Sequence, residues 1–409
     1  MFEYSTGIRN IKRQKSKSIL NILISIVIVL LLNVYFGNIS SIKGQLSELP
    51  DAIPVTARVS NLNGSLTSGI AIKNEAITGI KNSPYIKSPV FTIQLSIGFG
   101  ELSAADVNTG LNIDGLGCND IRGISGLQES ELSWLMDSKK DFFTSNSKEC
   151  IIEKAILEER NMKVGDTVTL TTYYYHYLLN GTHEILLEPL VVQNYKIVAS
   201  MDMHNYTGTG SPPNIIIPFG TVEEAFLSKG LTFMPDSAFF TVKNPFELNE
   251  FKKEMKELRF LQVSAESEFQ FDGNALIIND DTFIQAAEQL EESLTLLQVG
   301  LPLIIIIVAF IGYISAYLLI QNRKSEYAIM RSVGVKHAEA FGILFFENAL
   351  LQLFGSIAGS LIAFLVVVSN LQVIALVIAM FLVFYLTGTS VALWNLGRLS
   401  VMDVLTKHD

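Results

Sequence analysis

The chain has 409 residues, of which 49% are hydrophobic and only 17% are charged, and its mean hydropathy is +0.36. A soluble chain of this length would form two or three domains with a much more charged surface. The composition therefore excludes an ordinary soluble protein and indicates an integral membrane protein. The formal net charge of −10 is also unlike that of a nucleic-acid-binding protein.

Four apolar segments predict transmembrane helices. A helix rises ~1.5 Å per residue and the hydrocarbon core of a bilayer is ~30 Å thick, so ~20 apolar residues cross it. The first run could instead be a cleaved signal peptide, but its apolar part is long for that role and no small-residue cleavage site follows, so we expect a retained anchor. The predicted spans are residues 19–37, 299–320, 342–368 and 371–393.

The distribution of Lys and Arg predicts the orientation. Five basic residues precede the first span, four lie between the second and third, and two follow the fourth, whereas the turn between the third and fourth has none. The positive-inside rule places both termini on the cytoplasmic side of the membrane. The predicted cytoplasmic segments are residues 1–18, 321–341 and 394–409. Residues 38–298 then face outward, with 34 acidic against 19 basic residues.

The outward segment predicts an α+β domain over residues 51–282, built from two subdomains. Runs rich in β-branched and aromatic residues predict strands, charged periodic runs predict helices, and a Gly- and Pro-rich stretch predicts an exposed loop. The strands are Asp166–Tyr175, Tyr195–Ala199, Asn214–Pro218 and Ala238–Val242, the helices are Glu149–Asn161 and Pro245–Phe260, and the loop is 205–213. The fold class is thus a membrane protein with four transmembrane α-helices and a large extracytoplasmic domain inserted between the first two.

Two heptad-like seams flank this domain. The first follows the first span at residues 38–50, and the second precedes the second span at residues 283–298. We expect them to extend the two spans outward as a paired helical stalk; two separate amphipathic helices are the alternative. The seam residues are Ile39, Ile42, Leu46, Leu49, Phe283, Ala287, Leu290, Leu294 and Leu297.

Motifs for chemistry within the chain are absent from the sequence. It contains no phosphate-binding loop, no H-E-x-x-H and no G-x-S-x-G. His183-Glu184 lacks a second histidine, and the Met201–His204 cluster has too few ligands for a metal site. We therefore expect no catalytic residue, metal or cofactor in this chain. Cys118 and Cys150 both fall in the outer domain, where a disulfide is permitted; two free thiols are equally compatible.

The segment 321–341 predicts a short amphipathic helix on the cytoplasmic side. Tyr327, Met330 and Val333 recur at a spacing of three, and Gly334 can adopt the left-handed conformation that ends a helix. Such a helix either lies flat on lipid headgroups or docks into a groove of a cytoplasmic partner. The residues alone leave both alternatives open.

Residues 323–334 (RKSEYAIMRSVG) resemble the signature of FtsX/MacB-like ABC transporter permeases, also called type VII, and Leu157–Leu170 resembles a run in the outer domain of that family. The resemblance implies a permease that binds a separate cytoplasmic ATPase, which itself binds ATP and Mg²⁺. It assigns ATPase coupling to a set of residues in this segment. They are Arg323, Glu326, Tyr327, Met330, Arg331, Val333 and Gly334.

The same resemblance implies a homodimer or heterodimer of permeases that moves its outer domain by mechanotransmission. An export system for peptides or amphipathic compounds is the leading expectation, with an extracytoplasmic adaptor as a further partner. The alternatives are an FtsX-type regulator of an extracellular cell-wall hydrolase, and a membrane receptor that needs no ATPase.

Three residues in the third span complete the set of candidates. Glu347 lies near its start, where we expect it at headgroup depth as an anchor beside Arg323, Arg331 or lipid. Gly355 and Gly359 form a G-x-x-x-G step, which favours close helix packing and suggests a dimer interface.

Overall fold

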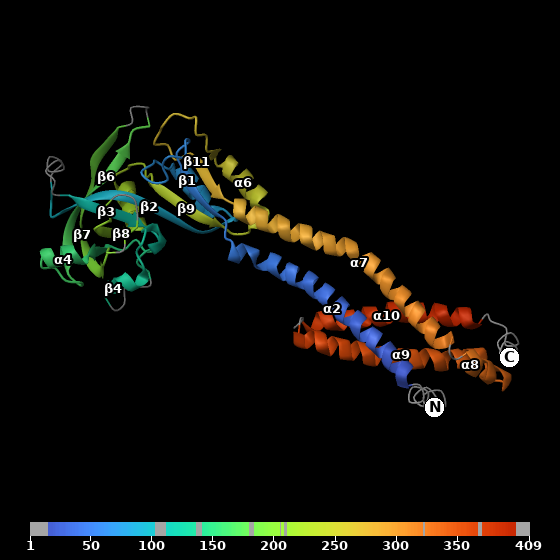
Figure 1. Ribbon diagram of the computed structural model, residues 1–409. Coiled ribbons are helices and arrows are strands. Elements are labelled where there is room, and N and C mark those ends of the chain that lie inside the picture. The colour runs from blue at the N-terminus through green and yellow to red at the C-terminus, as the bar shows by residue number, and fades with distance from the viewer. Residues whose placement is uncertain are drawn as a thin grey trace. The chain divides into compact units, whose positions relative to one another are not determined.

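The computed structural model describes residues 15–102, 112–135, 141–179, 184–204, 206–207, 211–321, 324–366 and 370–397. The chain divides into two compact units. One contains residues 50–284, and the other contains the segments on either side of them. The first unit is α+β and the second is helical, and Figure 1 shows the elements of each.

The α+β unit is built on one sheet of eleven strands. Their order is β10-β11-β1-β9-β2-β3-β8-β5-β7-β4, with β6 pairing both β2 and β7. The strands are β1 Thr56–Ser60, β2 Ile86–Phe99, β3 Ile113–Cys118, β4 Leu132–Trp134, β5 Glu149–Glu153, β6 Thr167–Tyr177, β7 Ile185–Met201, β8 Ile215–Pro218, β9 Ser237–Val242, β10 Leu261–Gln262 and β11 Ala275–Asn279.

Strand β2 joins the two halves of this sheet. Its first part pairs with β9 and its last part pairs with β6, and β3 pairs with the middle, all antiparallel. The helices of the unit are α3 Asn74–Asn82, α4 Lys154–Glu159, α5 Phe219–Ser228 and α6 Leu248–Glu257. They pack through apolar stripes. In α6, for example, Leu248, Phe251 and Met255 are buried at the spacing of one helix face.

The four strands expected from the sequence are present as β6, the end of β7, β8 and β9. The helix expected over residues 149–161 is only partly correct, because its first five residues form β5. Cys150, Ile151 and Ile152 in this strand are fully buried between β7 and β8. A strand buried on both faces shows no alternation, so its pattern does not distinguish it from a helix. The described part of the loop 205–213 has no helix or strand.

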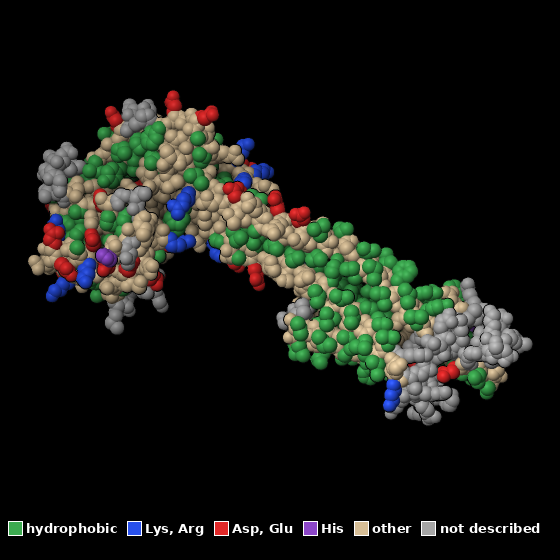
Figure 2. Space-filling view, in the orientation of Figure 1, with side chains coloured by type: hydrophobic (Ala, Val, Ile, Leu, Met, Phe, Trp, Pro, Cys, Tyr) green, Lys and Arg blue, Asp and Glu red, His purple; other side chains and the backbone are tan. Residues whose placement is uncertain are grey.

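The helical unit contains four helices that are long and apolar enough to cross a membrane. They are α2 Lys15–Ala52, α7 Asp281–Gln321, α9 His337–Val366 and α10 Leu371–Gly397, and the short helix α8 Lys324–Ser332 lies between α7 and α9. On the face shown in Figure 2, hydrophobic side chains cover most of this unit, whereas acidic side chains gather on the α+β unit. Such an apolar surface fits contact with lipid.

Helices α2 and α7 are far longer than a membrane is thick. With 38 and 41 residues they measure ~57 and ~62 Å, about twice the hydrocarbon core. Each therefore covers a predicted span and the predicted stalk segment beside it without a break. Pro50 lies in the last turn of α2, which ends two residues later.

Candidate coupling site and transmembrane bundle

Helix α8 ends in a closed cap. Gly334 has a φ of +92°, which favours glycine, and its N–H donates to Arg331 O at 3.2 Å. The N–H of Val335 reaches back to Met330 O at 3.0 Å, so the last carbonyls of the helix are satisfied. The Arg331 guanidinium donates to Val335 O at 2.9 Å, and this hydrogen bond stabilises the same turn. The helix that the sequence predicts is thus present, and hydrogen bonds define its C-terminal end.

One face of α8 packs against the end of the transmembrane bundle. Tyr327 is 8% exposed and lies in a cluster that contains side chains of three other helices. Ala328 beside it is also buried. The buried members of that cluster are Ala316 of α7, Ala340 and Leu344 of α9, and Ala392 and Leu393 of α10. Helix α8 therefore packs against three of the four long helices.

The exposed apolar face of α8 differs from the one expected. Ile329 is 54% exposed and Val333 is 78% exposed, whereas Tyr327 points inward and Met330 is half-buried. Residues advance ~100° per position, so the spacing of six from Tyr327 to Val333 places them ~120° apart, while Ile329 and Val333 lie only ~40° apart. The outward pair is thus Ile329 of α8 and Val333, which directly follows the last residue of α8. Of the other expected residues, Glu326 is half-buried and Arg323 lies outside the described residues.

A buried hydrogen-bond network joins all four long helices. Its centre is Asn21 of α2, whose Oδ1 accepts from Ser315 Oγ of α7 at 2.5 Å and from the Tyr385 hydroxyl of α10 at 3.1 Å. Its Nδ2 donates to Asn348 Oδ1 of α9 at 3.1 Å. Asn348 then donates to Thr389 Oγ1 of α10 at 3.2 Å. Each polar side chain inside an apolar bundle needs such a partner, so the network fixes how the helices meet.

Glu347 lies in the interior of the helical unit. It lies ten residues into α9, is fully buried, and precedes Asn348 of the network. The expected pairing with Arg323 involves a residue outside the described ranges, so the anchor at the membrane interface stays a prediction. The carboxyl group belongs to the polar interior of the bundle.

Gly355 and Gly359 bring two helices of the same chain together. A Cβ added at Gly355 would lie 2.6 Å from the Cβ of Ser25, and one added at Gly359 would lie 2.9 Å from Ile26 O. Both neighbours belong to α2. The close packing expected from the G-x-x-x-G step is thus present, but it serves α2 and α9 within the chain and leaves these glycines buried, not at a dimer interface.

The seam residues form the more protected side of α2 and α7. Ile39, Leu49, Phe283 and Ala287 are buried, and Ile42, Leu46, Leu290, Leu294 and Leu297 are half-buried. Near the inner end of the seams the Tyr35 hydroxyl of α2 donates to Leu297 O of α7. The two helices therefore meet where the predicted spans end, and the pairing further out stays a prediction.

Cys118 and Cys150 are both free. Cys118 is in β3 and Cys150 is in β5, and β8 lies between these strands. Strands two positions apart are separated by ~10 Å, which is beyond the reach of a disulfide. Burial raises the pKa of both thiols, so they stay protonated and inert. Met201 and Met203 are likewise buried, which removes their sulfur atoms from any site with the exposed His204.

Comparison with known proteins gives structural matches only, because no family model matches the sequence and no curated protein matches it. One match is the periplasmic region of MacB from Actinobacillus actinomycetemcomitans, at 11% identity and a TM-score of 0.31, covering 58% of this chain and 93% of that one. Another is the extracellular domain of the noncanonic ABC-type transporter YknZ from Gram-positive bacteria, at 13% identity, a TM-score of 0.27, and coverage of 50% and 90%. A third is a domain of a putative permease from Porphyromonas gingivalis, at 11% identity, a TM-score of 0.29, and coverage of 55% and 86%.

Proposed function

We propose that this chain is the membrane subunit of a MacB-like ABC transporter, in which a separate cytoplasmic ATPase moves α8 and the helices relay that movement to the outer domain. The orientation from the positive-inside rule puts α8 and both termini in the cytoplasm. ATP and Mg²⁺ belong to the partner ATPase, and this chain contributes no catalytic residue.

The exposed pair Ile329 and Val333 is the observation that supports this function most directly. A flat membrane-surface helix would be free to orient its whole apolar face toward lipid. In α8, Tyr327 is instead fixed in the bundle and only a narrow apolar edge faces away from it. Full burial of two aliphatic side chains of this size is worth about 1.5–3 kcal/mol each, which suits docking into a groove of a partner.

Contacts within the helical unit support a relay of movement from α8 to the outer domain. Tyr327 ties α8 to α7, α9 and α10, and Asn21 ties α2 to the same three helices. Because α2 and α7 run unbroken through the predicted spans and stalk segments, a tilt of the bundle displaces their outer ends. This arrangement supports mechanotransmission better than passage of a substrate between the helices.

Further partners complete the proposal. A second permease copy, identical or related, would form the dimer, and an extracytoplasmic adaptor would receive the movement of the outer domain. Export of peptides or amphipathic compounds is the proposed outcome. The location is the bacterial plasma membrane, with lipid around the four spans.

Co-purification tests the docking role of α8. The chain, solubilised from its native membrane, is expected to retain an ATPase with a phosphate-binding loop, identified by mass spectrometry. Val333→Asp and Ile329→Asp should each lose it, because a carboxylate would be buried in the contact. Ala338→Asp, at an exposed position in the first turn of α9, is the matched control and should retain the ATPase. Equal retention by all variants would show that α8 does not dock.

A further inference from the structure

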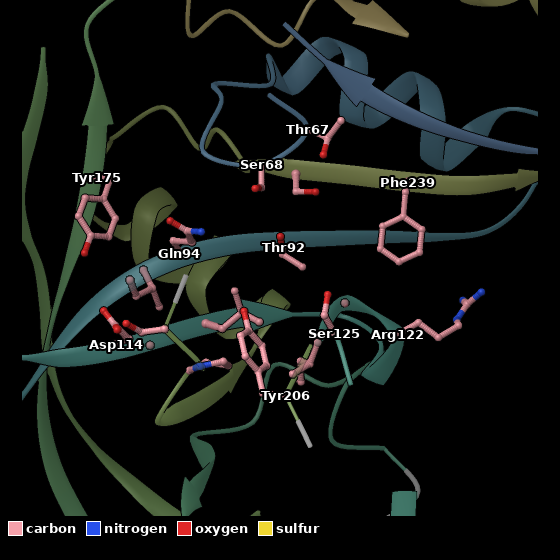
Figure 3. Close-up of a pocket in the computed structure, with 18 of the residues that line it drawn as sticks. Thr67, Ser68, Thr92, Gln94, Asp114, Arg122, Ser125, Tyr175, Tyr206 and Phe239 are labelled. Atoms are coloured by element: carbon pink, nitrogen blue, oxygen red, sulfur yellow. The ribbon is translucent and has the colours of Figure 1, made fainter. Parts of the chain in front are cut away.

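The α+β unit carries a polar cleft that the proposed function does not use. It encloses about 430 Å³ on the face of the sheet formed by β1, β9, β2 and β3. Figure 3 shows Thr92 and Gln94 of β2 along its floor, with Asp114 of β3 toward one end and Phe239 of β9 toward the other. Hydroxyl groups line the middle, among them Thr92, Ser125 and Ser68. All of its lining residues belong to this one unit.

One end of the cleft presents a free cation. Arg58 of β1 lies opposite Phe239 of β9 in the sheet register, and its guanidinium carbon is 5.0 Å from the centre of that ring. The part of the chain that the structure describes offers Arg58 no ion-pair partner. Arg122 also lines the cleft, but its charge is matched by Asp120 at 2.9 Å. Arg58, oriented by the ring, is therefore the group that can receive a carboxylate as a fork.

The other end presents a carboxylate among aromatic rings. Asp114 is exposed, and no Lys or Arg of the described ranges forms an ion pair with it. Tyr175 and Tyr206 line the cleft together with Asp114. Burial and the charge of Asp114 raise the pKa of both phenol groups. In Figure 3, Tyr175 lies above Asp114 and Tyr206 lies to its right. A carboxylate with neighbouring phenol rings is a recognition site for an ammonium or guanidinium group.

The distance between the two ends sets the length of a ligand. On β2, Val90 lies opposite Phe239, and Ser96 lies opposite Asp114. These positions are six residues apart, or about 20 Å along the strand. Strands β1 and β3 are also three spacings apart, or about 14 Å across the sheet, and the Arg58 and Asp114 side chains shorten the resulting gap. An extended peptide of about four to six residues has this length.

The geometry points to binding of a short extended peptide in this cleft, with a cationic group beside Asp114 and a carboxylate on Arg58. The hydroxyl groups between these ends supply hydrogen bonds to the peptide backbone. Binding requires neither ATP nor movement of the helices, so this inference is independent of the proposed function. The charges at the two ends fix the direction of the peptide.

Calorimetry on the full chain in lipid nanodiscs, without any ATPase, tests the inference. The probes are tetraalanine with free termini, its N-acetyl derivative and its C-terminal amide. Free tetraalanine should bind, and blocking either end should weaken binding about tenfold, which is ~1.4 kcal/mol. Arg58→Gln should lower the affinity for the free peptide about tenfold and leave the affinity for the amide unchanged. Asp114→Asn should lower the affinity for the free peptide and leave the affinity for the acetylated peptide unchanged.

Arg160→Gln is the matched control. Arg160 also stacks on a ring, with its guanidinium carbon 3.9 Å from the centre of Phe99, but it lies outside the cleft. It should leave all three affinities unchanged. The inference would be overturned if the free peptide did not bind or if all three probes bound equally. It would also be overturned if Arg160→Gln lowered the affinity as much as Arg58→Gln.

Discussion

Replacement of the buried Asp236 should remove a pH dependence from the stability of the α+β unit. Asp236 precedes β9 and is 1% exposed. Its carboxyl group accepts from the N–H of Gln94 at 2.5 Å and from Thr92 Oγ1 at 3.2 Å. Burial disfavours the charged form and raises the pKa of Asp236 from 3.8 to about 7, although these hydrogen bonds partly oppose the rise.

The direction and size of this pH dependence follow from the linkage between folding and proton binding. Because the folded-state pKa of Asp236 is above the unfolded value, the folded state holds a proton that the unfolded state releases. The free energy of unfolding therefore falls as the pH rises from about 4 to about 7, by ~1.4 kcal/mol per pH unit, and is constant above that. Between pH 5 and pH 8 the loss is ~3 kcal/mol. Asp236→Asn keeps an oxygen for Gln94 and a donor for Thr92, but it cannot ionise, so this loss should disappear.

Tryptophan fluorescence can report on this unit alone. The chain has two tryptophans, Trp134 in β4 and Trp394 in α10. In a Trp394→Phe background, urea unfolding of the solubilised protein is followed through Trp134 at pH 5 and pH 8. The stability difference between the two pH values should shrink by ~3 kcal/mol in Asp236→Asn. An unchanged difference would refute the assignment of a raised pKa to Asp236.

Three further predictions concern the membrane topology and the helical unit. A cysteine at Ser211 should react in intact cells with a membrane-impermeant thiol reagent, while one at Ser325 should not; reaction at position 325 from outside would contradict the four-span topology. Ser293→Pro in α7 should keep ATP hydrolysis and abolish export, because proline breaks a helix at ~3 kcal/mol or more; normal export at normal expression would exclude a lever. Asn21→Leu should lower the thermal stability of the solubilised protein by about 1–3 kcal/mol, since it removes bonds to three helices, whereas Asn33→Leu, which loses one interhelical bond, should cost less.

Much of the helical unit could be predicted from the sequence because charge is excluded from lipid. The four spans, the helix α8 and its glycine end follow from local patterns. The outward face of α8 could not be found in this way, because a spacing of three drifts around the helix and only the bundle determines that Tyr327 is the inward residue. The network around Asn21 has a partial signal in the polar residues of otherwise apolar spans, but its partners Ser315 and Tyr385 are hundreds of residues away.

The cleft shows why a site on a sheet escapes sequence analysis. Arg58 and Asp114 have no motif and no fixed spacing, and they come to one face only through the register of β1, β9, β2 and β3. The strand β5 was predicted as the start of a helix, because burial on both faces removes the alternation that identifies a strand. Both failures arise from pairing between distant segments, which local composition does not contain.

Hydrogen–deuterium exchange on the complex of this chain with its ATPase tests the central claim most directly. Exchange is compared with and without ATP along α2 and α7. We expect an ATP-dependent change in exchange at the outer segments 38–49 and 285–298. We expect Val333→Asp to abolish this change, because the ATPase moves the permease through the docked α8. A change confined to the buried interior of the bundle, or an outer response that survives Val333→Asp, would contradict it.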